Sequence, residues 1–231
     1  GGQSSGSNPG EVRMPIVAFG NASADVYNVY GELAIQDPDM RLRRVVLRVY
    51  REENGKEKEL ITRKNFKNRG NITIPNVWPD TSILIQGTFV WTNTAGEKVT
   101  VSFMDDVPLH TLSLDHLAPY TFTRGESANF YEDRIRIPDM QLTSSNPADL
   151  LYISRGNVEV YKKGESESSG ETLALSGSDI RALRQGKQLN WISDGVLKSG
   201  TDYEWHLTLT DRFGNDLPHT NEESLSGSSR T

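Results

Sequence analysis

The sequence predicts an all-β protein made of two tandem antiparallel β-sandwiches. Short segments in which apolar and polar residues alternate recur along the chain, and turn-forming Gly, Pro, Asn and Asp residues separate them roughly every ten residues. No segment has the apolar period of a long amphipathic helix, which argues against α/β folds. Several segments also occur twice in the same order, which predicts a duplicated module.

The clearest strand pattern spans residues 203–210, in which Tyr203 and Trp205 begin an apolar row that alternates with polar residues. The alternation predicts one face on a core and one face in water. A turn follows, and residues 81–96 repeat both features with the turn glycines 118 positions apart (214 − 96). We predict structural roles, in a core or a turn, for Tyr203, Trp205, Trp91, Gly96 and Gly214.

Three further pairs of segments match in the same order. Residues 23–27 match 127–131, residues 38–40 match 138–140, and residues 49–51 match 160–162. Solenoids repeat every ~20–50 residues, so the wider spacing favours two tandem domains. The predicted regions are a flexible leader (1–12), module 1 (13–106), a packed junction (107–118), module 2 (119–220) and a flexible tail (221–231).

The pattern places the strands in order. In module 1 we expect strands at 15–19, 24–35, 44–51, 57–63, 71–76, 82–92 and 97–104, with Asn54-Gly55 as a hairpin turn. In module 2 we expect strands at 120–123, 128–137, 150–161, 171–175, 188–192 and 203–210, and a short helix at 178–184 capped by Ser178. Residues after Gly214 have little β-propensity, so the last strand is either very short or missing, which would leave a sheet edge open.

Residues 197–203, Leu-Lys-Ser-Gly-Thr-Asp-Tyr, resemble the Leu-x-x-Gly-Thr-x-Tyr signature of fibronectin type III and immunoglobulin-like sandwiches. The resemblance implies that Tyr203 forms a tyrosine corner, in which its hydroxyl bonds to nearby backbone. Module 1 differs, because Ile83 stands at the tyrosine position. The resemblance implies a binding, spacing or adhesive module, although a fold alone assigns no function.

Composition restricts the partners and the chemistry. The chain has no cysteine, which excludes disulfides and thiolate metal sites. Its net charge is −6 without a basic stripe, so no nucleic acid is expected as a partner. No apolar run reaches about 20 residues, so no membrane insertion is expected. Nucleophile-elbow, P-loop and dinucleotide motifs are also missing from the sequence, and we expect no enzyme.

Two kinds of site remain as candidates. Asp105, Asp106 and Asp115 are possible calcium ligands at the junction, because Ca²⁺ prefers carboxylate and carbonyl oxygens; the alternative is a solvated acidic linker. Trp78 and Trp191 are candidate sugar-binding residues if they are exposed, and core residues otherwise. No other cofactor is expected.

The sequence therefore favours a non-enzymatic structural or binding module pair of a larger cell-surface, secreted or virion protein. Its partner is a protein or the parent polypeptide, and the run Arg41, Arg43 and Arg44 is a candidate contact for an anionic partner. The alternatives are a carbohydrate-binding or accessory module of a polysaccharide-acting protein, and an assembly factor that uses an open sheet edge.

Overall fold

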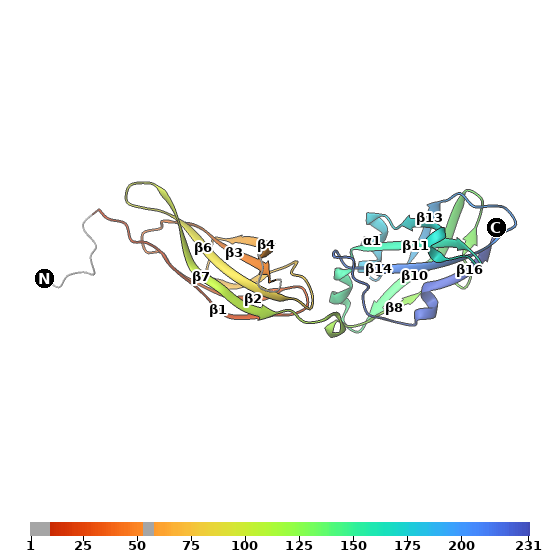
Figure 1. Cartoon of the computed structure of the whole chain (residues 1–231), viewed down its shortest axis with the longest axis horizontal. Helices are drawn as coiled ribbons and strands as arrows, with labels where there is room; N and C mark the ends of the chain where they lie inside the picture. Colours follow the sequence, from red (N-terminus) through yellow and green to blue (C-terminus); the bar gives the residue numbers. More distant parts are fainter. Residues whose placement is uncertain (1–9, 53–57) are drawn as a thin grey trace. The chain divides into compact units, whose positions relative to one another are not determined.

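The computed structural model describes residues 10–52 and 58–231, so the predicted turn at Asn54-Gly55 lies outside the described residues. The chain forms two compact units, Gly1–His116 and Leu117–Thr231 (Figure 1). Each unit contains two β-sheets, and the prediction of tandem antiparallel sandwiches is confirmed. No helix in the described part is long and apolar enough to cross a membrane.

Unit 1 is a β-sandwich of a three-stranded sheet, in the order β1-β2-β5, and a four-stranded sheet, in the order β4-β3-β6-β7. All its strand pairs are antiparallel. Its elements are β1 (Ile16–Ala24), β2 (Val29–Gln36), β3 (Leu42–Arg51), β4 (Glu59–Phe66), β5 (Gly70–Ile74), β6 (Ser82–Thr92), β7 (Lys98–His110) and the 3₁₀ turn η1 (Leu114–His116). Residues 107–110 of the predicted junction thus belong to β7.

The core of unit 1 lies between these sheets. Alternate residues of β3 and β6, such as Leu47 and Ile85, are fully buried there, as the period of two predicts. Trp91 is half-buried and packs against this core. Gly87 on β6 lies beneath the Phe103 ring, because a Cβ at Gly87 would lie 2.4 Å from that ring. Glycine is needed there for close contact with the aromatic side chain.

Unit 2 has the same arrangement with additions. One sheet runs β13-β10-β8-β15, with β9 paired to β10, and the other runs β12-β11-β14-β16. The elements are β8 (Tyr120–Thr123), β9 (Asn129–Phe130), β10 (Arg134–Ser144), η2 (Pro147–Tyr152), β11 (Arg155–Lys162), η3 (Glu167–Ser169), β12 (Glu171–Ala174), α1 (Gly177–Arg184), β13 (Leu189–Asp194), β14 (Asp202–Thr210), β15 (His219–Thr220), η4 (Glu222–Leu225) and β16 (Ser226–Arg230).

The corner at Tyr203 has the geometry that the resemblance implies. The Tyr203 side chain is buried, and its hydroxyl accepts a hydrogen bond from the Lys198 backbone N–H at 2.8 Å. In unit 1, where Ile83 stands at the tyrosine position, a different hydroxyl bonds to the backbone. Thr111 is fully buried, and its hydroxyl donates to the Trp78 carbonyl at 2.6 Å and accepts from the Thr81 N–H at 2.9 Å. A threonine from the end of one strand replaces the tyrosine hydroxyl.

The turns after β6 and β14 are equivalent, as their sequences predict. The side-chain oxygen Oδ1 of Asn93 accepts from the Glu97 N–H at 2.9 Å, and the Asp211 carboxylate accepts from the Asn215 N–H at 2.9 Å. Gly96 and Gly214 complete these turns with φ of 79° and 87°, a backbone region that favours glycine.

One of the matched pairs is not equivalent. Residues 38–40 connect β2 to β3, whereas residues 138–140 lie within β10, at a shift in its register with β13. The shared Pro-Asp-Met sequence therefore occurs at two different positions of the sandwich, and the predicted equivalence of these two segments is wrong. The matches at 49–51 and 160–162 do fall on equivalent strand ends, β3 and β11.

Four predicted elements of unit 2 need correction. Residues 147–152 form a 3₁₀ helix before β11, and residues 131–133 separate β9 from β10. Helix α1 begins after Ser176, not Ser178, because Ser176 and Asp179 form a reciprocal capping box. The predicted flexible tail at 221–231 is wrong as well, since β16 pairs with β14. The open-edge alternative thereby loses the feature that suggested it.

Candidate functional site

Three arginines mark the outer face of the four-stranded sheet of unit 1. Arg44 and Arg48 alternate with core residues on β3, so their side chains point away from the core. Arg63 on β4 lies directly opposite Arg48 in the register of the two strands. Arg44 and Arg63 are exposed, and Arg48 is half-buried. We call these three residues the arginine set.

The arginine set places like charges side by side. Directly opposed like charges destabilise a sheet, by up to about 1 kcal/mol for an exposed pair. The Arg48 guanidinium donates from Nη1 to Thr88 Oγ1 at 2.9 Å, and neither Arg48 nor Arg63 forms an ion pair with a residue in the described part of the chain. The fold therefore presents two adjacent guanidinium groups that remain available to an external anion.

A row of apolar side chains crosses the same face next to the arginine set. Tyr50 is opposite Leu60 on one side and Leu84 on the other, and Leu84 is opposite Pro108. Leu60 is 48 % exposed, whereas Leu84 is buried by its neighbours. We call Leu60, Tyr50, Leu84 and Pro108 the apolar row. An apolar strip beside arginines is typical of protein interfaces.

The acidic residue beside this face is already engaged. Asp106 pairs with the Lys58 ammonium and accepts from Gln86 Nε2 at 2.7 Å. The hydrogen bonds from Lys58 and Gln86 hold the pKa of Asp106 below its ordinary value. The negative charge of Asp106 is thus compensated by Lys58, and Asp106 forms no ion pair with the arginine set among the described residues.

Sequence reasoning found only part of the arginine set. Of the three predicted contacts for an anion, Arg44 lies on the face, whereas the Arg43 guanidinium donates to Thr92 Oγ1 at 2.6 Å and Arg41 is half-buried. Arg48 was missed although its spacing of four from Arg44 gives it the same strand face. Arg63 required the β3–β4 register, which the sequence does not display.

The two candidate sugar-binding tryptophans have different environments. Trp191 is 1 % exposed and faces the core from β13, so the core alternative holds for Trp191 and its ring is not accessible to a sugar. Trp78 is half-buried, and the Arg51 guanidinium lies 4.7 Å from its ring centroid. Part of the Trp78 ring is therefore covered by a cation–π contact rather than free for a sugar.

The predicted calcium ligands do not assemble. Asp105 accepts from Ser102 Oγ at 3.1 Å, Asp106 pairs with Lys58, and Asp115 bonds to Ser113 beside it. Within the described residues, no group of three His, Cys, Asp or Glu side chains is arranged to hold a metal ion. Each carboxylate instead satisfies a local hydrogen bond, because adjacent strand residues and a separate 3₁₀ turn point in different directions.

A hydrogen-bonded chain of Ser82, His110 and Asp80 resembles a catalytic arrangement only in its residue types. Ser82 Oγ lies 3.0 Å from His110 Nδ1, and His110 Nε2 lies 3.0 Å from Asp80 Oδ1. The His110 and Asp80 side chains are 56 % and 69 % exposed. Water surrounds such groups and screens them, whereas catalytic triads depend on a site that excludes water. We assign this chain of bonds to the surface of unit 1.

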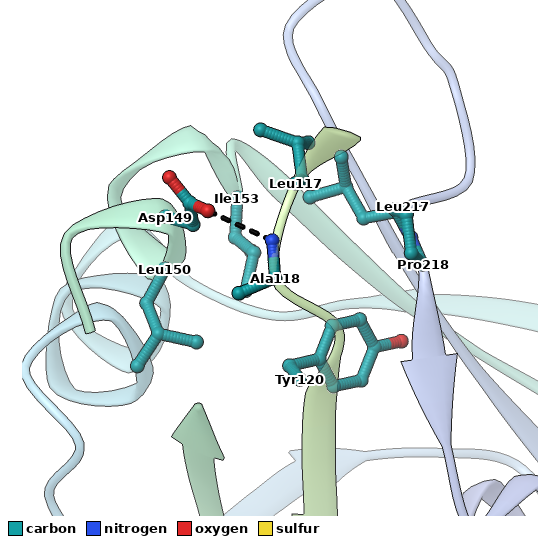
Figure 2. A pocket seen from close by; sticks show the side chains of 8 residues that line it. All are labelled: Leu117, Ala118, Tyr120, Asp149, Leu150, Ile153, Leu217 and Pro218. Atoms are coloured by element: carbon teal, nitrogen blue, oxygen red, sulfur yellow. Dashed lines mark hydrogen bonds between the residues drawn. The ribbon is translucent and has the colours of Figure 1, made fainter. Parts of the chain in front are cut away.

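A small pocket lies at one end of unit 2, where Leu117, Tyr120, Asp149, Leu150 and Leu217 are among its lining residues (Figure 2). Its volume is about 10 Å³, which is the space of one water molecule. The Asp149 carboxylate accepts from the Ala118 N–H at 2.8 Å and fixes the entry of the chain into β8. The pocket therefore suits a structural role and is too small for a substrate.

His219 packs against the Tyr120 ring, with 5.3 Å between the ring centroids, and pairs with Glu222. Burial by itself lowers the pKa of His219, but bonds to the Leu217 carbonyl and to Glu222, with the nearby Asp216 charge, raise the pKa above its ordinary value. Because the folded-state pKa is raised, the stabilisation is complete below about pH 6.5 and is lost as the pH rises through the folded-state value.

We therefore expect the free energy of unfolding of unit 2, measured by urea titration, to fall as the pH rises from about 6 to 8. The variant His219→Gln should show a flatter pH profile over the same range. A wild-type profile that matches the variant at every pH would contradict the contribution of the His219–Glu222 pair.

The strand order defines a tandem pair of β-sandwiches. The chain is similar to a two-domain fibronectin type III segment of chicken tenascin, at 11 % identity and a TM-score of 0.34, covering 96 % of this chain and 99 % of that one. It is also similar to the FN1–FN3 domains of chicken CNTN1, at 9 % identity and a TM-score of 0.38, covering 95 % and 68 %. No family model and no curated protein sequence matches the chain.

Proposed function

We propose that this chain is a non-enzymatic binding and spacing segment of a larger cell-surface, secreted or virion protein. In this proposal, unit 1 contacts an acidic protein partner through the arginine set and the apolar row. The observation that carries it is the opposed pair Arg48 and Arg63 on an outer sheet face, neither of which forms an ion pair with an acidic side chain among the described residues.

Charge and apolar area both support a protein partner. Guanidinium groups bind carboxylates in bidentate geometry, and a partner carboxylate would relieve the repulsion between Arg48 and Arg63. The neighbouring Tyr50 and Leu60 add apolar area, which a sulfated saccharide would not use. The preferred partner is therefore a protein segment with alternating acidic and apolar residues, whose side chains match a sheet face of period two.

A synthetic peptide of alternating Glu and Leu residues tests this function by isothermal titration calorimetry. We expect the wild-type chain to bind it, and Arg48→Glu or Arg63→Glu to weaken the affinity by ~10-fold or more, equivalent to about 1.4 kcal/mol. Raising the salt concentration should weaken the wild-type complex and leave the variants less affected.

The matched control is Arg155→Glu, which makes the same charge change at an exposed position of unit 2. This control should bind the peptide like the wild type. Equal affinities for the wild type and both unit 1 variants would exclude the arginine set as the contact.

A further inference from the structure

The sequence contains two Asn-x-Ser/Thr triplets without proline, at Asn21-Ala22-Ser23 and at Asn71-Ile72-Thr73. Such a triplet is the acceptor sequence for N-linked glycosylation. The other asparagines of the chain lack a Ser or Thr two positions later. The two triplets are about 50 residues apart in sequence, so nothing in their order predicts that they are neighbours.

The fold brings both triplets to the same face of the three-stranded sheet of unit 1. Tyr30 on the central strand β2 lies opposite Ser23 of β1 and Thr73 of β5. Two positions further along β2, Glu32 lies opposite Asn71. The two edge strands are separated only by β2, and neighbouring strands lie about 4.8 Å apart, so the acceptor triplets are about 10 Å from each other.

The acceptor side chains are accessible on this face. Asn21 and Asn71 are both exposed, and a register shift between Gly20 and Ser23 sets Asn21 in a positive-φ conformation (53°). An open groove of about 350 Å³ is lined by both asparagines together with Tyr30, Glu32 and Thr73. Space for a first sugar residue thus exists next to both amide nitrogens.

The existing hydrogen bond at Asn21 is compatible with a linked sugar. Asn21 Nδ2 donates to Glu32 Oε2 at 2.9 Å. A primary amide has two N–H groups, and glycosylation replaces only one of them. The remaining N–H can keep the bond to Glu32 and fix the direction in which the glycan leaves the sheet.

We propose that Asn21 and Asn71 are paired N-glycosylation sites whose oligosaccharides cover the outer face of the β1-β2-β5 sheet. In each transfer the amide nitrogen attacks the anomeric carbon of a lipid-pyrophosphate-linked oligosaccharide. A C–N bond forms, the bond from the anomeric carbon to the pyrophosphate oxygen breaks, the amide loses one proton, and the lipid pyrophosphate leaves with the electron pair. The proposal rests on the secreted or surface location given under the proposed function, because a chain meets the lipid-linked oligosaccharide donor on its way to secretion or to the surface.

The exposed Tyr30 ring gives the groove a place for the first sugars. Tyr30 is 37 % exposed, and its hydroxyl donates to Asp25 Oδ2 at 2.6 Å, which fixes the ring. Aromatic faces pack against the C–H groups of sugar rings. Glycans at this position cover the sheet that lacks the arginine set and leave the outer face of the β4-β3-β6-β7 sheet open to a partner.

The full chain, secreted from cultured human cells behind a secretion signal, provides the test. We expect intact-mass spectra with two N-glycans, and peptide N-glycosidase F should convert both Asn21 and Asn71 to Asp. Ser23→Ala and Thr73→Ala should each remove one glycan, because the hydroxyl two residues after the asparagine is required. Ser23→Thr preserves the triplet and should preserve the glycan.

Glu223→Thr creates a new triplet at the exposed Asn221 of unit 2 and is the positive control for glycosylation of this chain. A secreted protein that is modified at Asn221 in this variant, but not at Asn21 or Asn71, overturns the proposal. Peptide binding through the arginine set should survive enzymatic removal of the glycans. An absence of glycans together with intact peptide binding indicates failure of this proposal alone. Glycans at both sites together with a loss of peptide binding indicate failure of the proposed function alone.

Discussion

Replacing Trp205 by alanine is expected to lower the free energy of unfolding of unit 2 by about 3–5 kcal/mol, the range for removal of a buried tryptophan. Trp205 is 1 % exposed and packs directly on the last strand, because a Cβ at Gly227 would lie 2.7 Å from its Nε1 atom. The Arg124 guanidinium lies 4.9 Å from the ring centroid. The cavity left by the indole cannot be filled without moving β14 and β16.

Urea unfolding followed by circular dichroism measures this effect. The control is Val196→Ala, at a residue that is 84 % exposed, which should change the free energy by no more than about 0.5 kcal/mol. If Trp205→Ala were as stable as this control, the indole would not be a main support of the unit 2 core.

Thr111→Val is expected to destabilise unit 1 by about 2–4 kcal/mol although valine has nearly the same shape. The change removes the hydroxyl that bonds to the Trp78 carbonyl and the Thr81 N–H, and leaves both backbone groups without that partner. Since Thr111 is fully buried, water cannot replace the lost bonds without local opening.

The matched change in unit 2 is Tyr203→Phe, which removes one bond to the Lys198 N–H and should cost about 1–2 kcal/mol. The comparison is made by chemical denaturation of each variant. If Thr111→Val lowered the free energy of unfolding by no more than Tyr203→Phe does, this result would contradict the view that the Thr111 hydroxyl stabilises the fold by bonding to both backbone groups.

The candidate sites show why the sequence predicted some groups and not others. Arg44 and Arg48 share a strand face by their spacing, which the sequence displays directly. Arg63, and the meeting of Asn21 with Asn71, depend on strand register and order, which join distant residues. The calcium prediction for Asp105, Asp106 and Asp115 was wrong for the same reason, because nearness in sequence does not bring side chains to one point.

The sequence alone determined the strands whose side chains alternate and the turns at Gly96 and Gly214, and its resemblance to a known signature implied the corner at Tyr203. These features follow from local chemistry, since period, positive φ and a short backbone bond involve neighbouring residues. The tertiary structure decided β16, whose residues Ser-Gly-Ser-Ser-Arg have little intrinsic strand preference.

Long-range contacts stabilise β16 in place of the strand preference that its own residues lack. The Arg124 guanidinium donates to the Ser224 and Ser226 carbonyls at 2.9 and 2.8 Å, and Ser229 Oγ donates to the Ala128 carbonyl at 3.1 Å. Gly227 then fits beneath the Trp205 ring, where a side chain would collide. Partners about 100 residues away in the chain therefore fix the last strand, because its own residues supply neither apolar area nor β-propensity.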